Sequence, residues 1–365
     1  MTGHIAAFVP NVLRFSPGQR SRIELWASFL EAAGWTIGLH PFEDQDLHQV
    51  LYEEGRTADK ARHLLTCYRR HITSLVRKVD GADLAFVYRE AALVGPALSE
   101  RLLARRPIPL IYDLDDPTWL PYRSPTSGWM SLLKFPGKTR SLFRLADHVI
   151  TINATIGGYA GRFNPDVTVI PNCVDTHRYR PQPRASEGGV RLAWIGSHST
   201  MRNLATITNA LRQVQAAAPV SLRIVGSGSV PLEGVRAEVV EWSPDTEVQD
   251  LAECDIGLVP VDDDPWNHWK FFFKTIQYMA LGLPVVARRV GSNSEIVEEG
   301  VTGYLVEKER EWIDRLLLLA RDEPLRRRMG EAARASVVER FSLDRQMPRL
   351  VSVFETVLAG SRSIA

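Results

Sequence analysis

The stretch that decides the fold is KFFFKTIQYMALGLPVVARRVG, residues 270–291 of the 365-residue chain. Ile276, Met279 and Ala280 recur at the spacing of one helix face, which predicts an amphipathic helix. Gly282 follows where a helix favours a left-handed cap, and the apolar run after it predicts a short buried strand. Helix, tight turn and buried strand in this order are typical of a doubly wound α/β domain.

Two lysines suggest a function for this unit. Lys270 and Lys274 lie near the expected start of the helix, where backbone N–H groups lack partners within the helix. Free N–H groups and ammonium groups together favour the binding of phosphate. The alternative is an ordinary αβ unit in which both lysines are solvated caps.

Length and composition place the chain among globular proteins. A length of 365 residues is enough for about two domains, and 45% hydrophobic with 24% charged residues is typical of globular chains. The net charge of +1 gives no reason to expect nucleic acid as a partner. No apolar run approaches the ~18 residues that span a bilayer, and the start, MTGHIAAFVP, does not resemble a secretory signal.

The chain has three cysteines, Cys67, Cys173 and Cys254. They are scattered and odd in number, which fits reduced thiols and predicts a cytoplasmic location. Their spacing matches no pattern of metal ligands.

Alternating strand and helix patterns occur in two regions, which predicts parallel sheets covered on both faces. A proline- and glycine-rich stretch, THRYRPQPRASEGG, separates them and is the best linker candidate. We therefore expect an α/β fold of two Rossmann-like, doubly wound parallel-sheet domains that face a cleft. The expected boundaries are 1–175 for the first domain, 176–189 for the linker, 190–342 for the second domain, and 343–365 for a C-terminal helix that could cross back to the first.

Several motifs resemble a bacterial subgroup of the family 4 retaining glycosyltransferases, which have the GT-B fold. In chain order they are FVYREA (86–91), YDLDD (112–116), ADHVI (146–150), PNCVDTHRY (171–179), IGSHSTMRN (195–203) and DIGLVP (255–260), followed by the unit at 270–291. Their order and spacing carry the resemblance over nearly the whole chain.

The resemblance implies transfer of a sugar from a nucleoside diphosphate, with UDP favoured, to a hydroxyl acceptor with retained anomeric configuration. The acceptor would be a natural product, a glycan or a lipid-linked intermediate. Neither a cofactor nor a catalytic metal is implied.

Two alternative functions stay open. One is a sugar-nucleotide epimerase or hydrolase, for which Asp115 and His198 are the candidate groups. The other is a non-catalytic protein that binds nucleotide sugars.

On the donor side, the resemblance implies that cations stabilise the departing diphosphate. Arg202 and Lys274 are the expected catalytic cations, Lys270 supports them, and Gly196 and Ser197 form the turn that approaches the donor. A surface role is the alternative for Arg202. However, a cation near a helix start opposes the helix dipole, which favours an anionic ligand there.

Four further residues complete the expected donor site. Gln277 stands where the family usually has the second of two glutamates, and its amide is expected to hold the ribose hydroxyls. Trp269 takes the place of the first glutamate and could stack on a sugar. Phe272 belongs to the same segment, and Trp242 is the candidate for stacking on the base. A hydrophobic plug or core packing is the alternative for these aromatic residues.

The first half is expected to bind the acceptor. Gly18 would allow the backbone to approach the diphosphate and sugar, and Arg20 and Arg22 would contact phosphate or acceptor. Asp115 is the candidate polar group at the reaction centre, and Trp119 completes the acceptor site. The alternatives are a plain helix start with surface arginines and an aspartate–proline turn. An Asp-x-Asp pattern also marks metal sites in the GT-A fold, but the second half favours GT-B.

Residues 123–144 contain cations and apolar side chains without an acidic residue. We interpret this stretch as a lid over the acceptor site. The alternative is a patch that makes peripheral contact with a membrane surface.

Overall fold

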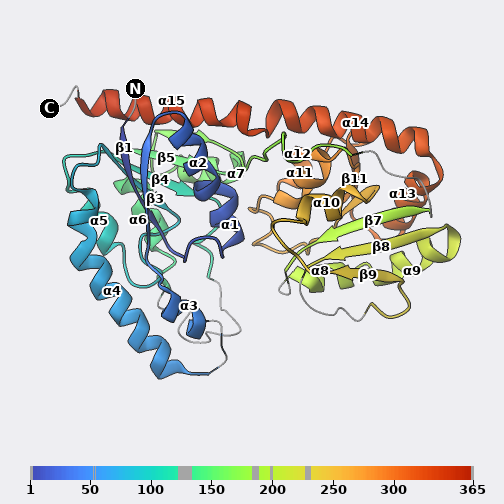
Figure 1. Cartoon of the computed structure of the whole chain (residues 1–365), viewed down its shortest axis with the longest axis horizontal. Coiled ribbons are helices and arrows are strands. Elements are labelled where there is room, and N and C mark those ends of the chain that lie inside the picture. The colour runs from blue at the N-terminus through green and yellow to red at the C-terminus, as the bar shows by residue number, and fades with distance from the viewer. Residues whose placement is uncertain are drawn as a thin grey trace. The chain divides into compact units, whose positions relative to one another are not determined.

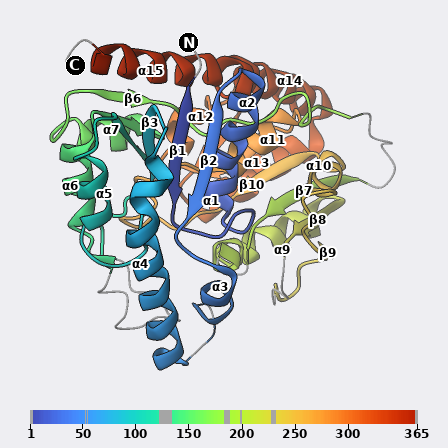
Figure 2. The same ribbon diagram turned by 60° about the vertical axis from the view of Figure 1, so that its left-hand side comes forward.

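The computed structural model of the chain (Figures 1 and 2) is described for residues 3–51, 53, 55–121, 134–182, 189–197, 200–226 and 232–362. It divides into two compact units. The first consists of Met1–Asn172 with Gln346–Ala365, and the second of Cys173–Arg345. The change of unit lies close to the predicted boundary at residue 175. In the predicted linker, residues 176–182 belong to the second unit, and residues 183–188 lie outside the described residues.

The first unit contains a six-stranded parallel sheet in the order β2-β1-β3-β4-β5-β6. Strands β3 and β4 are buried at every position, as expected for interior strands of a sheet covered on both faces. The strands are β1 His4–Val9, β2 Thr36–Pro41, β3 Leu84–Tyr88, β4 Leu110–Leu114, β5 His148–Thr151 and β6 Val167–Val169. The helices are α1 Pro17–Gln19, the π-helical η1 Arg20–Glu24, α2 Leu25–Ala32, α3 Gln45–Leu51, α4 Thr57–Val79, α5 Leu98–Leu103, α6 Lys138–Leu145, α7 Ala154–Ala160 and most of α15 Leu343–Arg362.

The second unit repeats this architecture with a parallel sheet in the order β12-β11-β10-β7-β8-β9. Its core gathers Trp194 and Leu222 from the sheet with Leu211 and Trp312 from the covering helices. The strands are β7 Val190–Ile195, β8 Val220–Val225, β9 Ala237–Val240, β10 Ile256–Val259, β11 Val285–Arg288 and β12 Gly303–Val306. The helices are α8 Met201–Ala205, α9 Thr208–Ala217, α10 Glu247–Ala252, α11 Phe273–Ala280, α12 Asn293–Ile296, α13 Glu309–Arg321 and α14 Glu323–Arg340.

Each sheet has a topological switch point beside its first strand. In the first unit β1 lies between β2 and β3, and in the second β7 lies between β8 and β10. Connections leave such a point in opposite directions, which opens a crevice at the carboxyl ends of the strands. Residues that follow β1 and β3, or β7 and β10, are therefore placed to form a binding site.

The predicted α/β fold of two doubly wound domains is confirmed. The deciding unit has the predicted order: α11 ends at Ala280, Gly282 has φ +73°, and β11 follows. The C-terminal helix begins at Leu343, as predicted. Within the described residues, no helix combines the length and the apolar character that crossing a bilayer requires.

Three local details differ from or add to the sequence predictions. The helix expected from about residue 20 to 33 is present, and it contains the π-helical η1 before α2 begins. The helix expected over residues 203–217 is divided into α8 and α9, because the hydroxyls of Thr206 and Thr208 donate to preceding carbonyls and compete with helical bonding. Strand β12 was not predicted from the sequence.

Candidate functional site

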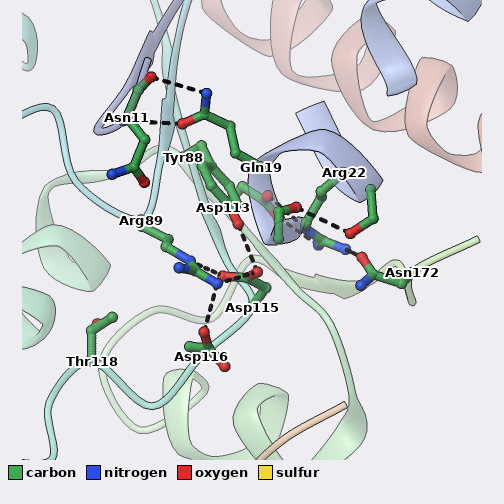
Figure 3. Close-up of polar contacts among 12 residues, drawn as sticks. Asn11, Gln19, Arg22, Tyr88, Arg89, Asp113, Asp115, Asp116, Thr118 and Asn172 are labelled. Atoms are coloured by element: carbon green, nitrogen blue, oxygen red, sulfur yellow. Dashed lines mark hydrogen bonds and ion pairs between the residues drawn. The ribbon is translucent and has the colours of Figure 1, made fainter. Parts of the chain in front are cut away.

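In the first unit, charged side chains meet where β3 and β4 end (Figure 3). The Arg89 guanidinium spans the Asp115 carboxylate: its Nε donates to Oδ1, and its Nη2 donates to Oδ2 at 2.7 Å. Arg89 Nη2 also donates to Asp116 Oδ2 at 2.5 Å, and the Tyr88 hydroxyl donates to Asp115 Oδ2 at 2.7 Å. Both oxygens of Asp115 are therefore engaged.

The electrostatics of this cluster favour an ionised Asp115. Burial opposes ionisation, but the Arg89 guanidinium and the Tyr88 hydroxyl outweigh it and hold the pKa of Asp115 below its usual range. The side chain of Asp115 is only 4% exposed, whereas that of Arg89 is 21% exposed. Arg89 and Asp116, which is 18% exposed, are thus the members of the cluster that a ligand can reach, and Asp115 orients Arg89.

Gly18 lies against this cluster. A Cβ atom on Gly18 would stand 2.7 Å from Arg89 Nη2 and 3.0 Å from Asp115 Oδ2, so a side chain here would displace the Arg89 guanidinium. The loop before Gly18 is closed by Asn11 and Gln19, whose backbone and amide groups exchange hydrogen bonds of 3.1 and 3.0 Å. The structure therefore brings the predicted residues Gly18 and Asp115 together, and their roles toward donor and acceptor stay predictions.

Arg22 is buried in an internal ion pair. Its Nε donates to Asp113 Oδ2 at 2.6 Å, and its Nη2 donates to Asp113 Oδ1 at 2.5 Å. Its Nη1 donates to the carbonyl of Ile170 at 2.9 Å. Because both side chains are 0% exposed, Arg22 presents no surface to an acceptor. Burial raises the pKa of Asp113 to about 6, and attraction to Arg22 limits the rise.

The other predicted acceptor residues pack close to helices of the first unit. Arg20 is half-buried in η1, the segment that also carries Arg22. The Trp119 ring stacks on Tyr159 with centroids 4.3 Å apart and an interplanar angle of 20°. Trp119 is therefore a packed aromatic residue in this structure, and its contact with an acceptor stays a prediction.

The described part of residues 123–144 packs against the rest of the first unit. Lys138 is buried, pairs with Glu90 at 2.6 Å and donates to the carbonyl of Ala92 at 2.7 Å. Arg140 donates to the Tyr159 hydroxyl at 3.0 Å, and the Arg144 guanidinium lies over the Phe163 ring. These cations hold α6 in place. Residues 122–133, which carry Arg123, Trp129, Met130 and Leu132, lie outside the described residues.

In the second unit, two glycine turns meet at the carboxyl ends of β7 and β8. Gly196 follows β7 and Gly226 follows β8, and a Cβ atom on Gly226 would stand 2.2 Å from the Gly196 carbonyl oxygen. Ser197 is exposed beside Gly196, and His198 lies outside the described residues. Arg202, the second residue of α8, is 76% exposed, and its Nε lies 3.7 Å from Asp262 Oδ2. The turn therefore carries an accessible cation.

Lys274 lies in the first turn of α11, which follows β10 across the switch point. Its ammonium group lies 4.8 Å from the centroid of the Trp194 ring. Burial, reinforced by the charge of Lys270, lowers the pKa of Lys274 to about 7. In the described ranges of the chain, no carboxylate forms an ion pair with Lys270 or Lys274. An anion bound here would favour the protonated form of Lys274.

A buried carboxylate links two of the predicted donor residues. Glu247 Oε1 accepts from Gln277 Nε2 at 3.0 Å and from the Tyr179 hydroxyl, and Glu247 Oε2 accepts from Trp242 Nε1. Gln277 Nε2 also donates to the Tyr179 oxygen at 3.0 Å. Phe272 is buried and donates its backbone N–H to Ser292 Oγ at 2.9 Å.

Sequence reasoning missed Arg89, Tyr179 and Glu247. Arg89 and Tyr179 lie inside quoted motifs, FVYREA and PNCVDTHRY, but the motifs alone do not show which side chain takes part. Glu247 has no local signal, because its partners Gln277 and Tyr179 are far from it in the sequence. Among the described residues, no group of three or more His, Cys, Asp or Glu side chains is arranged to hold a metal ion.

Two doubly wound parallel sheets, each with charged groups at its switch point, define the GT-B class of protein. Residues 189–322 match the family model described as glycosyl transferases group 1. The resemblance to glycosyltransferases is thus confirmed.

Curated relatives match parts of the chain. It is 26% identical over 213 residues to N-acetyl-alpha-D-glucosaminyl L-malate synthase of Bacillus anthracis, a match over 53% of this chain and 54% of that protein. It is 30% identical over 94 residues to spore coat protein SA of Bacillus subtilis, a match over 24% of this chain and 25% of that protein. The chain thus spans about half, or less, of the length of these relatives.

Solved structures match nearly the whole chain in fold. Sucrose-phosphate synthase from Thermosynechococcus elongatus superposes with a TM-score of 0.73 and 16% identity, over 98% of this chain and 100% of that one. Anabaena Alr3699/HepE in complex with UDP-glucose superposes with a TM-score of 0.66 and 19% identity, over 97% and 100%. At this identity the likeness establishes the fold.

Proposed function

We propose that this protein is a retaining family 4 glycosyltransferase that moves a sugar from a nucleoside diphosphate, preferably UDP, to a hydroxyl acceptor. One observation carries the proposal: Lys274 and Lys270 stand at the start of α11, beside the switch point, without a carboxylate partner among the described residues. This site lies in the unit that matches group 1 glycosyltransferases. The UDP-glucose in the Anabaena structure supports UDP as the nucleotide.

The residues suit a reaction in which charge develops on a departing diphosphate. The acceptor oxygen bonds to the anomeric carbon while the bond from that carbon to the phosphate oxygen breaks. The acceptor proton passes to an oxygen of the departing phosphate. Lys274 and Arg202 would stabilise the new negative charge, and Lys270 would add to the field. Asp115 does not suit the role of nucleophile, because Arg89 and Tyr88 occupy both of its oxygens.

We further propose that the transfer needs no metal ion, because two to three cations of the chain supply the positive charge. Turnover should then be unchanged by EDTA. A loss of turnover that magnesium or manganese restores would contradict the proposal that no metal is needed.

A cytoplasmic location is proposed as well. The three cysteines support it, since all are buried and none is in a disulfide.

The first test is thermal unfolding in the presence of UDP, GDP, dTDP, ADP and CMP. A ligand that binds only the native state stabilises it by about 2.7 kcal/mol at a hundred times its Kd. We expect UDP to raise the melting temperature most. The absence of a shift with every nucleotide would overturn the proposed donor site.

The second test follows turnover. A UDP-sugar that stabilises the chain is incubated with hydroxyl acceptors, and proton NMR reports the anomeric configuration of the product. Retention is expected, whereas an inverted product would refute the retaining mechanism. Binding without transfer or slow donor hydrolysis would favour a non-catalytic protein.

A further inference from the structure

We propose that Arg89 and Asp116 determine acceptor specificity, and that they select an uncharged, hydroxyl-rich acceptor such as a neutral sugar over an acceptor that carries a carboxylate. The inference rests on the proposed function, because it takes the first unit as the acceptor side of the reaction. It concerns one guanidinium and one carboxylate that lie just beyond the ends of β3 and β4 (Figure 3).

Arg89 is held in place through both its backbone and its side chain. Its N–H donates to the Asp113 carbonyl at 2.8 Å, and its own carbonyl accepts from the Tyr112 hydroxyl at 2.9 Å. Its φ of +57° is rarely adopted by residues other than glycine, and such conformations concentrate at functional sites. Asp115 grips one side of the guanidinium. The remaining N–H groups of Arg89 therefore point in a fixed direction.

The Arg89 guanidinium keeps one nitrogen for a ligand. Its Nε and Nη2 donate to Asp115 and Asp116, and Gly18 lies against Nη2. Within the described residues, Nη1 makes no hydrogen bond or ion pair, so its two hydrogens are available.

Asp116 keeps one oxygen for a ligand in the same way. Its Oδ2 accepts from Arg89 at 2.5 Å, and no described residue donates to its Oδ1. The side chains of Arg89 and Asp116 are 21% and 18% exposed, so both are within reach of a ligand. A hydroxyl group donates one hydrogen bond and also accepts. A free donor and a free acceptor on two bonded side chains therefore suit the hydroxyls of a sugar.

The charge of the cluster argues against an anionic acceptor. Two carboxylates, Asp115 and Asp116, share the single guanidinium of Arg89, which leaves one net negative charge. Two neighbouring ion pairs are each balanced and add no net charge: Arg22 with Asp113, and Lys138 with Glu90. Partly buried charges are screened less than exposed ones, so a carboxylate on the acceptor would be repelled. A hydroxyl in its place carries no such penalty.

The first test compares sugars that differ in one group. Glucose, galactose and mannose are paired with glucuronate, galacturonate and mannuronate, in which a carboxylate replaces the hydroxymethyl group. Saturation-transfer NMR with the full chain and UDP measures binding. We expect each neutral sugar to bind roughly tenfold or more tightly than its acid.

The outcomes of this test separate the two proposals. Equal or tighter binding of the acids would overturn the inference, and so would a failure of all three neutral sugars to bind. Either result leaves the proposed function standing as long as UDP binds in the same samples. Failure to bind UDP would remove the proposed function and the inference with it.

The second test removes the excess negative charge. Asp116→Asn keeps the size of the side chain, and the preference for a neutral sugar over its acid should fall to about threefold or less. Asp80→Asn is the matched control, because it removes the same charge from a 60% exposed residue just before β3, at the opposite edge of the parallel sheet. An unchanged preference in Asp116→Asn, or the same fall in Asp80→Asn, would contradict the inference.

The third test concerns the free nitrogen of Arg89. Arg89→Lys keeps a cation for both acids, but an ammonium group has three hydrogens, and the three carboxylate contacts of Arg89 would use them all. Binding of the neutral sugars should weaken by roughly tenfold. A melting curve and UDP affinity show whether the variant is folded. Undiminished sugar binding in folded Arg89→Lys would refute the contact, and Asp116→Asn decides if Arg89→Lys does not fold.

Discussion

The switch-point edges of the two units share a topology but use their charges differently. In the first unit, Arg22 pairs with Asp113 and Arg89 pairs with Asp115. In the second unit, the Lys274 ammonium group lies over the Trp194 ring and close to Lys270. Arg202 has only a distant contact of 3.7 Å with Asp262. Close ion pairs hold the shape of one edge. At the other edge, Arg202 is only loosely paired and Lys274 has no carboxylate partner among the described residues, which leaves this edge able to bind an anion.

The pKa values reflect the same difference. Burial disfavours ionisation of Asp115, but its cationic partner reverses the effect and the pKa lies below the usual range. Burial of Lys274 is not offset by an opposite charge, and its pKa falls to about 7. Groups with strongly perturbed pKa values are common at functional sites. Three substitutions and a change of pH test this difference between the charges of the two units.

The largest effect is expected on the stability of the first unit. Arg22→Ala leaves Asp113 buried without its partner, and such changes cost about 3–5 kcal/mol of unfolding free energy. Denaturant unfolding followed by circular dichroism measures the loss. Arg106→Ala is the matched control, because it removes an exposed pair with Asp80 at 3.2 Å and should cost less than about 1 kcal/mol. Equal losses would show that the Arg22 pair is not structural.

The next effect concerns activity in the second unit. Lys274→Met keeps an unbranched side chain over the Trp194 ring but removes the charge, so turnover should fall by roughly 10²–10³-fold. The variant should unfold no earlier than the unchanged protein, since a buried charge is lost. Initial rates with a UDP-sugar and a melting curve test both statements. We expect Lys270→Met to lose less turnover than Lys274→Met. Full activity in both variants would show that the proposed donor site is misplaced.

A smaller effect is expected for Arg202. Arg202→Ala should reduce kcat by roughly tenfold or more, because it removes a cation from the developing diphosphate charge. Arg327→Ala is a closely matched control: both arginines are 76% exposed, and Arg327 has a similarly loose contact of 4.0 Å with Glu331. Steady-state kinetics of the two variants gives the comparison. A similar loss in Arg327→Ala would assign the Arg202 effect to the fold or to general surface charge.

The smallest effect is a coupling between nucleotide binding and protons. Above pH 7 Lys274 is mainly neutral, so a bound diphosphate should draw a proton onto it, and UDP should bind more weakly as the pH rises. Calorimetry at pH 8 in two buffers of different ionisation enthalpy measures the uptake, which should stay below one proton. Lys274→Met should abolish that uptake, and an unchanged value in the variant would assign the proton to another group.

The ligand-free protein should show the opposite trend in stability. The unfolded chain binds a proton at Lys274 up to a pKa of about 10.5, whereas the folded chain releases it near 7. This residue therefore contributes a rise in stability as the pH increases between those values. The prediction would be contradicted if the difference in unfolding free energy between the unchanged protein and Lys274→Met stayed constant across this pH range.

The features that the sequence predicted depend on the spacing of apolar residues within an element. They also depend on the rule that parallel strands end at the same edge of a sheet. The apolar spacing around Ile276 located α11, and Gly282 marked its end. Because parallel strands end at the same edge, the turn at Gly196 and the start of α11 come together at the switch point. The grouping of Lys274 with the Gly196 turn therefore followed from the sequence.

The missed features depend on contacts that no local pattern encodes. Arg89 adopts φ +57° just after β3, a conformation unusual for an arginine, and it meets two acids just beyond the end of β4. Glu247 meets Gln277 from a different helix. Arg22 was assigned to a ligand because its neighbours resemble a binding loop, whereas its side chain points inward from η1.

The π-helical segment Arg20–Glu24 has a consequence for comparing this chain with its relatives. A π-turn holds one residue more than an α-turn, and each added residue rotates the following side chains by about 100° around the axis. A relative whose helix is α-helical throughout should therefore align with a single-residue gap near Arg22. Deleting one residue there would turn the guanidinium away from Asp113, so the buried ion pair depends on this short π-helical segment.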